Sequence, residues 1–339
     1  MWSKIKYRIA LLFLLFSISQ GVAQDCWLSD LTSLYQTTSN TNFKRFIDEP
    51  GGFENFKNFH GTVKSQNGLN NADFSNFLND VTRVPNPNRF ISEINSNPSL
   101  IDAWKVIINK SILRIDLLTL EAVSNLRRNR NFSNLGLTDD IISRIAGTRG
   151  LSYRAIITNL NNLGNKVSQH GIELIDFSKV VSDMLEGGSK VDGANWIVKY
   201  IGDRADDFAR RKLKFEEFNS TELGRRYVDV SDVTDEGFKI FYEFKSVLRV
   251  PPTDFQTQFM KDLTAARDLD QIRWVFNGAK NPSGSSGETF RAAILSKIDE
   301  LPLTDDLARK FLYGINNPTV AKLRQELIAQ FDEIFELAS

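Results

Sequence analysis

Two carboxylates and a lysine lie close together in RRYVDVSDVTDEGFKIFYEFKSV, residues 225–247, and their types suit chemistry on a phosphate. Asp229 lies in one β-rich run, and Glu243 and Lys245 lie two apart in the next, on one face of their strand. Buried charge needs compensation, and carboxylates bind the hard cation Mg²⁺, which polarises a phosphodiester and activates a bound water. A lysine can orient that water or offset charge that develops on the phosphate. The residues therefore indicate metal-assisted phosphodiester cleavage, and a solvated hairpin with a cross-strand ion pair is the alternative.

The elements that must position these residues follow from the surrounding pattern. Four β-rich runs are expected to be strands, at residues 214–218, 225–233, 238–248 and 271–278. Val228 and Val230 flank Asp229, and both are expected to point to the face opposite it. One amphipathic helix around Trp196 precedes the first three runs, and another follows RVPPTD. This α-β-β-β-α-β order predicts an α+β fold.

The rest of the chain is expected to be helical, and its first half contains no catalytic constellation. Apolar residues recur there every three to four positions. Beyond short helices packed by aromatic residues in 24–100, helices are expected at 100–130, 138–146, 151–163, 172–186, 287–300, 303–313 and 318–338. We therefore divide the chain into a leader (1–23), a helical N-terminal region (24–190), an α/β core of about four strands (191–282) and C-terminal helices (283–339).

The α/β core resembles the restriction-endonuclease-like superfamily, which is known by its PD-(D/E)xK motif. The likeness rests on the element order, on Asp229 in the second strand and on Glu243-Phe244-Lys245 in the third; the triplet [DE]xK occurs once in the chain. The resemblance implies that Asp229 and Glu243 ligate Mg²⁺ or Mn²⁺, that the carbonyl of Phe244 assists, and that Lys245 is catalytic. Val228 stands where the motif has proline. The surrounding residues resemble, more narrowly, nuclease domains of secreted bacterial polymorphic toxins.

Four further side chains are candidates for the same cleft. Glu217, in FEEF, could supply another metal carboxylate, and its neighbour Glu216 is nearly as plausible. Gln258, and less so Lys261, could face the cleft from the following helix, as sometimes happens in this superfamily. The alternatives, a surface glutamate and a polar helix face, stay open.

Charge does not select a nucleic-acid partner by itself. The chain has 42 basic and 42 acidic residues, and removal of the leader takes away Lys4, Lys6 and Arg8, so no global basic field attracts nucleic acid. A local groove could still be basic: Arg225 and Arg226 could contact phosphates, and ARRKLK at 209–214 could be a basic patch. The choice between a DNA and an RNA substrate stays open.

The N-terminus predicts export. Three basic residues, the apolar run IALLFLLFSI and the small residues of SQGVAQ follow one another as in a secretory signal peptide, with cleavage after Ala23. The apolar run is too short for a comfortable membrane span, although a retained anchor is the alternative. One cysteine, Cys26, allows no intrachain disulfide, and the two histidines, His60 and His170, disfavour histidine-based metal chemistry. We expect a secreted or periplasmic protein without lipid.

A partner follows from the toxin resemblance. A nuclease that reaches its producer's nucleic acid is lethal before export, so we expect a cognate immunity protein, small and acidic, covering residues 225–262. Two readings compete with the nuclease: a non-enzymatic secreted binding protein built on a nuclease-like core, and a helical interaction module in the N-terminal half.

Overall fold

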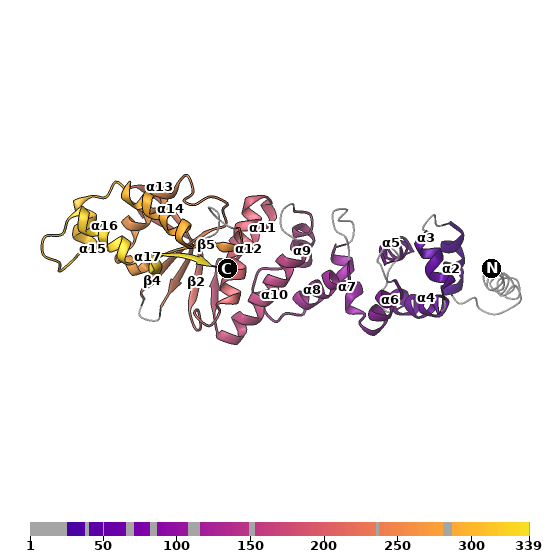
Figure 1. Cartoon of the computed structure of the whole chain (residues 1–339). Helices are drawn as coiled ribbons and strands as arrows, with labels where there is room; N and C mark the ends of the chain where they lie inside the picture. The colour runs from indigo at the N-terminus through magenta and orange to yellow at the C-terminus, as the bar shows by residue number, and fades with distance from the viewer. Residues whose placement is uncertain are drawn as a thin grey trace, which may run out of the picture. The chain divides into compact units, whose positions relative to one another are not determined.

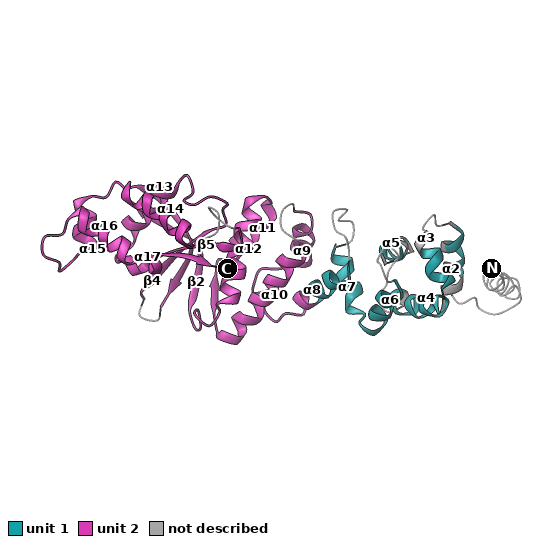
Figure 2. Cartoon of the chain, in the orientation of Figure 1, with its two compact units in different colours: residues 1–124 teal, residues 125–339 magenta. Residues whose placement is uncertain are grey.

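The structure, a computed structural model of the chain, describes residues 26–37, 41–49, 51–65, 71–81, 87–107, 116–148, 153–234, 237–280 and 287–338 (Figure 1). The leader and its cleavage after Ala23 lie outside these residues. None of the helices in the described part is long and apolar enough to cross a membrane. The chain forms two compact units, residues 1–124 and 125–339 (Figure 2), and the change to β-rich runs near residue 190 lies inside the second.

Unit 1 is helical in its described part and packs on aromatic rings. Its elements are α2 (Cys26–Thr37), α3 (Thr41–Asp48), α4 (Gly52–His60), the π-helix η1 (Gly61–Ser65), α5 (Asn71–Val81), α6 (Pro87–Ser96), α7 (Ser99–Ile107) and α8 (Leu117–Arg127), which spans the unit boundary. Phenylalanines three apart on α4 and α5 place their rings on one side of each helix. The ring of Phe77 stacks on Phe59 at a centroid distance of 5.1 Å and meets the edge of Trp104 at 4.8 Å.

Unit 2 joins helices to a six-stranded mixed sheet, so the chain is α+β as expected. Its helices are α9 (Asp139–Ile145), α10 (Tyr153–His170), α11 (Ser178–Glu186), α12 (Ser189–Asp203), α13 (Phe255–Ala265), η2 (Leu269–Gln271), η3 (Gly278–Lys280), α14 (Gly287–Asp299), α15 (Asp305–Phe311), α16 (Val320–Ala329) and α17 (Phe331–Ile334). Its strands are β1 (Glu173–Ile175), β2 (Lys212–Thr221), β3 (Gly224–Val233), β4 (Lys239–Lys245), β5 (Ile272–Asn277) and β6 (Phe335–Ala338). The strands lie in sequence order: β2, β3 and β4 pair antiparallel, and β1, β5 and β6 add in parallel to their neighbours.

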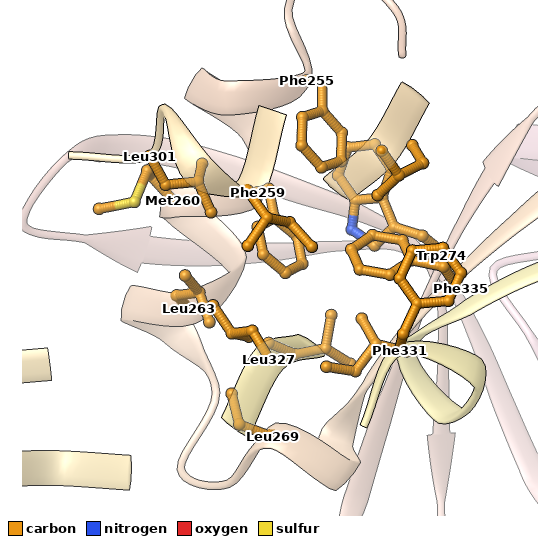
Figure 3. Packing of buried hydrophobic residues seen from close by; sticks show 14 of the residues in the cluster. Phe255, Phe259, Met260, Leu263, Leu269, Trp274, Leu301, Leu327, Phe331 and Phe335 are labelled. Carbon is orange, nitrogen blue, oxygen red and sulfur yellow. The ribbon is translucent and has the colours of Figure 1, made fainter. Parts of the chain in front are cut away.

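One face of the sheet packs on α13 and the C-terminal helices (Figure 3). Phe255 and Phe259 lie one turn apart on α13, so both rings point to the sheet. There each meets the edge of Trp274 on β5, at centroid distances of 5.1 and 5.9 Å. Phe335 of β6 completes this cluster. Full burial of such rings fixes α13 on the sheet, because each aromatic side chain buries 150–250 Å² of surface.

The other face packs on α11 and α12. Tyr242 and Phe244 alternate with Glu243 along β4 and therefore point away from α13. The ring of Phe244 contacts Tyr200 of α12 at 5.1 Å, and Tyr242 contacts Phe208 at 5.6 Å. On β2, Phe215 meets Phe177 at 5.2 Å. The aromatic residues around Glu243 thus divide between the two faces and bury both.

The sheet has six strands where about four were expected, because two predicted helices contain strands. Residues 173–175 form β1: Gly171, at φ 67°, follows the end of α10 in the left-handed conformation that glycine favours. At the other end, residues 335–338 leave the helical pattern and pair with β5. Pairing with the edge of β5 gives hydrogen-bond partners to backbone groups that would lack them at a helix end. This gain outweighs the local helix propensity.

Two helix boundaries also differ from the prediction. The expected helix at 100–130 is two helices, α7 and α8, and residues 108–115 between them lie outside the described chain. The helix expected to end at residue 163 continues to His170. Gly164 lies inside it because Asn129 packs closely there: a Cβ on Gly164 would lie 2.7 Å from the Asn129 Oδ1 atom.

Candidate active site

The strands that carry the candidate residues twist at Asp229. Val230 lies across from Tyr242, whose ring belongs to the α12 face, whereas Val228 belongs to the buried cluster of the α13 face. Regular alternation would put both valines on one face. The expectation that both point away from Asp229 is therefore wrong, because the strand turns over between them.

The neighbouring strand β2 turns over at the same level. Lys214 and Glu217 are three apart, so a regular strand would point them to opposite faces, yet Lys214 Nζ lies 3.3 Å from Glu217 Oε1. Of the two residues between them, Glu216 has φ 51°, in the left-handed region that side chains seldom adopt. The pairs Phe215–Val230 and Glu217–Val228 put Glu216 across from Asp229. Non-glycine residues in this conformation concentrate at functional sites.

This twist brings the Asp229 carboxylate into the gap between β3 and β4. The register of the two strands runs from Val233 opposite Lys239 to Val230 opposite Tyr242. Beyond that point the backbone N–H of Phe244 donates to Asp229 Oδ2 at 2.7 Å. The Asp229 carboxylate therefore accepts a backbone hydrogen bond from β4 and lies next to Phe244, the residue between Glu243 and Lys245.

Glu243 and Lys245 point to the α13 face, as their spacing predicts. Lys245 Nζ donates to Glu243 Oε1 at 2.5 Å and to Gln258 Oε1 at 2.7 Å. It also lies 5.1 Å from the ring centroid of Trp274, a favourable position for a cation. The Gln258 side chain in turn donates to Asp254. The structure thus brings Asp229, Glu243, Lys245 and Gln258 together, and Lys245 is held in one orientation by two oxygen acceptors.

Arg226 is buried beside these residues. Its guanidinium donates to Asp262 Oδ1 and to Glu243 Oε2, both at 2.5 Å, and its side chain is only 8% exposed. Trp274 Nε1 donates to the other Asp262 oxygen at 2.9 Å. The structure commits Arg226 to two buried carboxylates, so its guanidinium is not presented to a phosphate here.

Sequence reasoning missed Asp262. A usable signal exists, because Asp262 lies at helical spacing from Phe255 and Phe259 on the buried stripe of α13. A carboxylate on an apolar stripe needs a buried partner, and Arg226 is that partner.

Burial and repulsion dominate the electrostatics of this cluster. Burial, followed by the negative charge of Glu243, raises the pKa of Asp229 well above its ordinary value, against the opposing effect of Lys245 and the Phe244 N–H. Burial lowers the pKa of Lys245, but Glu243 and Asp229 outweigh it, so this pKa is raised. Burial also raises the pKa of Asp262 to about 6, although Arg226 opposes the shift. Three carboxylates thus share two cations.

Of the remaining candidates, Glu217 and Arg225 are not brought into this cluster, whereas Glu216 lies near it. Glu217 is buried and bound to Lys214 and Lys239, the latter at 2.9 Å, so the structure does not bring it to Asp229. Glu216 lies nearer: burial, then the charges of Asp183 and Glu243, raises its pKa. Arg225 is exposed.

Two further predicted positions are engaged elsewhere. Lys261 Nζ donates to the Arg225 carbonyl at 3.2 Å rather than to a group of the cluster. In the 209–214 patch, Lys212 Nζ lies 3.6 Å from Glu173, and Lys214 binds Glu217.

The donor set suits a hard cation only after a rearrangement. Within the described ranges, no three histidine, cysteine, aspartate or glutamate side chains are grouped as a metal site. Glu243 uses both oxygens, one for Arg226 and one for Lys245, and Asp229 uses Oδ2 for Phe244. Carboxylate and carbonyl oxygens are nonetheless the ligands that Mg²⁺ and Mn²⁺ prefer. Asp229, Glu243 and the Phe244 carbonyl would hold the ion once Glu243 releases one of its partners.

Comparison with known proteins does not identify a relative. No protein-family model, no curated protein and no solved structure gives a significant match to the chain.

Proposed function

We propose that the protein is a nuclease of the restriction-endonuclease-like superfamily, which hydrolyses phosphodiester bonds of DNA or RNA with Mg²⁺ or Mn²⁺. The observation that carries the proposal is the convergence of Asp229, Glu243 and Lys245 at the twist of β3 against β4. The surplus of negative charge in a buried cluster favours a bound cation. A hairpin that served only as a charged surface would not need to bury these groups.

Each side chain has a role that follows from its contacts. Asp229 and Glu243 would hold the ion, which when bound supplies an activated water and neutralises charge on the phosphate. Lys245, held between Glu243 and Gln258, directs its ammonium toward the place where charge develops. Arg226 offsets the repulsion between the Glu243 and Asp262 carboxylates. Through Asp262 it also holds α13 against the strands.

The experiment is cleavage of plasmid DNA and of RNA by the purified chain. We expect cleavage with Mg²⁺ or Mn²⁺, none in EDTA, and little with Ca²⁺, which accepts looser coordination geometry. Asp229→Ala, Glu243→Ala and Lys245→Ala should each reduce the rate by about 100-fold or more. Glu217→Gln is the matched control, because it removes a buried carboxylate of the same sheet that lies outside the cluster.

Cleavage that persists in EDTA, or that is equal in the wild type and Lys245→Ala, overturns the proposal. A non-enzymatic binding protein is the reading that remains if no preparation cleaves either nucleic acid while the fold is intact by circular dichroism.

Export as a bacterial toxin extends this proposal. The leader sequence supports it, and N-terminal sequencing of secreted or periplasmic protein should find a mature chain that begins at Gln24. Cytoplasmic expression of the wild type should arrest growth, whereas Lys245→Ala should not. A small acidic immunity protein from the producer should rescue growth by covering residues 225–262. If no such protein rescues growth, the prediction of an immunity protein is wrong, while the nuclease proposal stands.

A further inference from the structure

The β2–β3 hairpin extends beyond the part of the sheet that pairs with β4. Residues 217–228 of the two strands pair with each other, whereas β4 follows β3 only over Val230–Val233. One face of this extension is covered, because Arg226 binds Asp262 of α13 and Val228 is buried. The opposite face carries the alternate side chains, and exposed residues alternate with buried ones from Arg225 to Val228.

Two aromatic rings lie on that open face. Phe218 and Tyr227 are cross-strand partners, their centroids are 5.3 Å apart, and they are 50% and 49% exposed. Exposed aliphatic residues scattered over a surface need no explanation, but rings gathered in one place mark a binding surface. Tyr227 is two residues before Asp229, which corresponds to about 7 Å along a strand. The rings are therefore close to Asp229 along the strand, but they lie on the face opposite the one to which Glu243 and Lys245 point.

Two cations lie near the rings. Arg225 is exposed, lies on the same face as Tyr227 and makes no ion pair within the described chain. Lys261 belongs to α13 on the covered face, and its Nζ donates to the Arg225 carbonyl at 3.2 Å, so a second cation lies at the edge of the hairpin. Of the carboxylates near the rings in sequence, Glu217 binds Lys214 and Lys239, and Asp229 belongs to the cluster. Glu222 acts on Lys310: burial lowers the pKa of Lys310, and Glu222 opposes that shift. Lys310 binds carbonyls at the end of α13, which packs on the covered face.

We propose that Phe218 and Tyr227 stack the bases of a single-stranded nucleic acid whose phosphates contact Arg225 and Lys261. This rests on the proposed nuclease function and assigns its substrate class: a single strand, or an unpaired segment, that passes over the hairpin to Asp229. In a duplex the flat faces of the bases are already stacked, so an aromatic ring reaches them only where the strand is unpaired. Rings bind such strands with little sequence preference, because every base offers a flat face.

The test measures binding of the full chain to fluorescently labelled strands in EDTA, where cleavage does not interfere. The probes are one mixed-sequence 20-nucleotide DNA strand, its RNA equivalent and the DNA duplex. The single strands should bind more tightly than the duplex. Phe218→Ala and Tyr227→Ala should each weaken single-strand binding by about 10-fold.

Matched variants separate stacking from loss of apolar surface. Tyr227→Phe keeps a ring and should bind like the wild type. Leu223→Ala removes an exposed aliphatic side chain of the same hairpin, which is 50% exposed, and should change binding less than about 2-fold. The rings are half exposed, so their removal should leave the fold intact, as circular dichroism would verify.

Equal single-strand binding by the wild type and the Phe218→Ala/Tyr227→Ala double variant overturns the inference. Tighter binding of the duplex, unaffected by the double variant, also overturns it and favours insertion of the hairpin into a groove. Single-strand binding that depends on the rings, without cleavage when Mg²⁺ is added, supports the binding surface and refutes the nuclease. Mg²⁺-dependent cleavage that does not depend on the rings refutes the binding surface alone.

Discussion

Two sets of carboxylates and lysines lie on neighbouring strands of one sheet, and they differ in how charge is balanced. In the first, Glu217 binds two lysines, Lys214 and Lys239, whose side chains are 38% and 40% exposed. In the second, Asp229 and Glu243 share Lys245, which is 13% exposed, and Glu243 also binds the buried Arg226. Both sets contain an ion pair shorter than 3 Å, so a close contact alone does not distinguish them.

The pKa values of the carboxylates do distinguish the two sets. Burial raises the pKa of Glu217, but the hydrogen bond and charge of Lys239, with the hydrogen bond from Lys214, outweigh it and leave this pKa lowered. At Asp229, burial and the charge of Glu243 prevail, and the pKa is raised. The first set behaves as a structural ion pair, which favours the ionised carboxylate. In the second set, Lys245 and Arg226 do not fully neutralise the negative charge of the carboxylates. Such perturbed groups are candidates for function.

The largest expected difference between the two sets is in activity. Lys245→Met and Lys239→Met each remove an ammonium that binds a buried glutamate. The first should reduce cleavage by about 100-fold or more, because it removes charge from the place of reaction. The second should leave the rate within about 2-fold. Initial rates on one labelled substrate with Mg²⁺ would measure both, and equal rates for the two variants would mean that Lys245 has no catalytic role.

The next largest effect is on stability and compares two adjacent arginines. Arg226→Met leaves Glu243 and Asp262 buried without their cation and should lower the free energy of unfolding by about 3–5 kcal/mol. Arg225→Met removes an exposed side chain and should change it by less than about 0.5 kcal/mol. Urea denaturation of the two variants would measure this. A small effect of Arg226→Met would mean that the carboxylates are neutral in the folded protein.

A third expectation concerns pH. Because the pKa of Asp229 is raised on folding, its contribution to stability is complete below the ordinary aspartate pKa and is lost as pH rises through the folded value. Asp229→Asn should therefore stabilise the metal-free protein at neutral pH, and this advantage should vanish in acid. Added Mg²⁺ should reverse the order, since the ion binds the ionised aspartate. Thermal unfolding at several pH values, with and without Mg²⁺, would test both statements.

Some of the structure follows from the sequence because local patterns decide it. The four expected strands formed where β-rich runs alternate and turn residues separate them. The spacing of Glu243 and Lys245 was enough to place both on one face, because alternation holds in β4. Gln258 was a candidate only through the superfamily resemblance, and local spacing left a polar helix face as the alternative. Local order is thus predictable wherever the backbone keeps its regular conformation.

The rest depends on interactions between segments far apart in sequence. No local signal shows that Glu216 adopts φ 51°, and this one residue changes which face Glu217 and Val228 occupy. The partnership of Arg226 with Asp262 joins residues 36 apart, so Arg226 looked like a surface cation. Residues 335–338 have a helical pattern but pair with β5, whose edge accepts them. Tertiary contacts decide each of these cases.

The smallest expected effect concerns the balanced set. Glu217→Gln should lower stability by about 1 kcal/mol at neutral pH, because two partly exposed lysines lose their acceptor. The lowered pKa of Glu217 means that its contribution is present above the ordinary glutamate pKa and is lost as pH falls through the folded value, so the variant should match the wild type in acid. This pH dependence is opposite to that of Asp229→Asn. If both variants changed stability with pH in the same direction, the two sets would be alike, and the carboxylates near Lys245 would be one more structural ion pair.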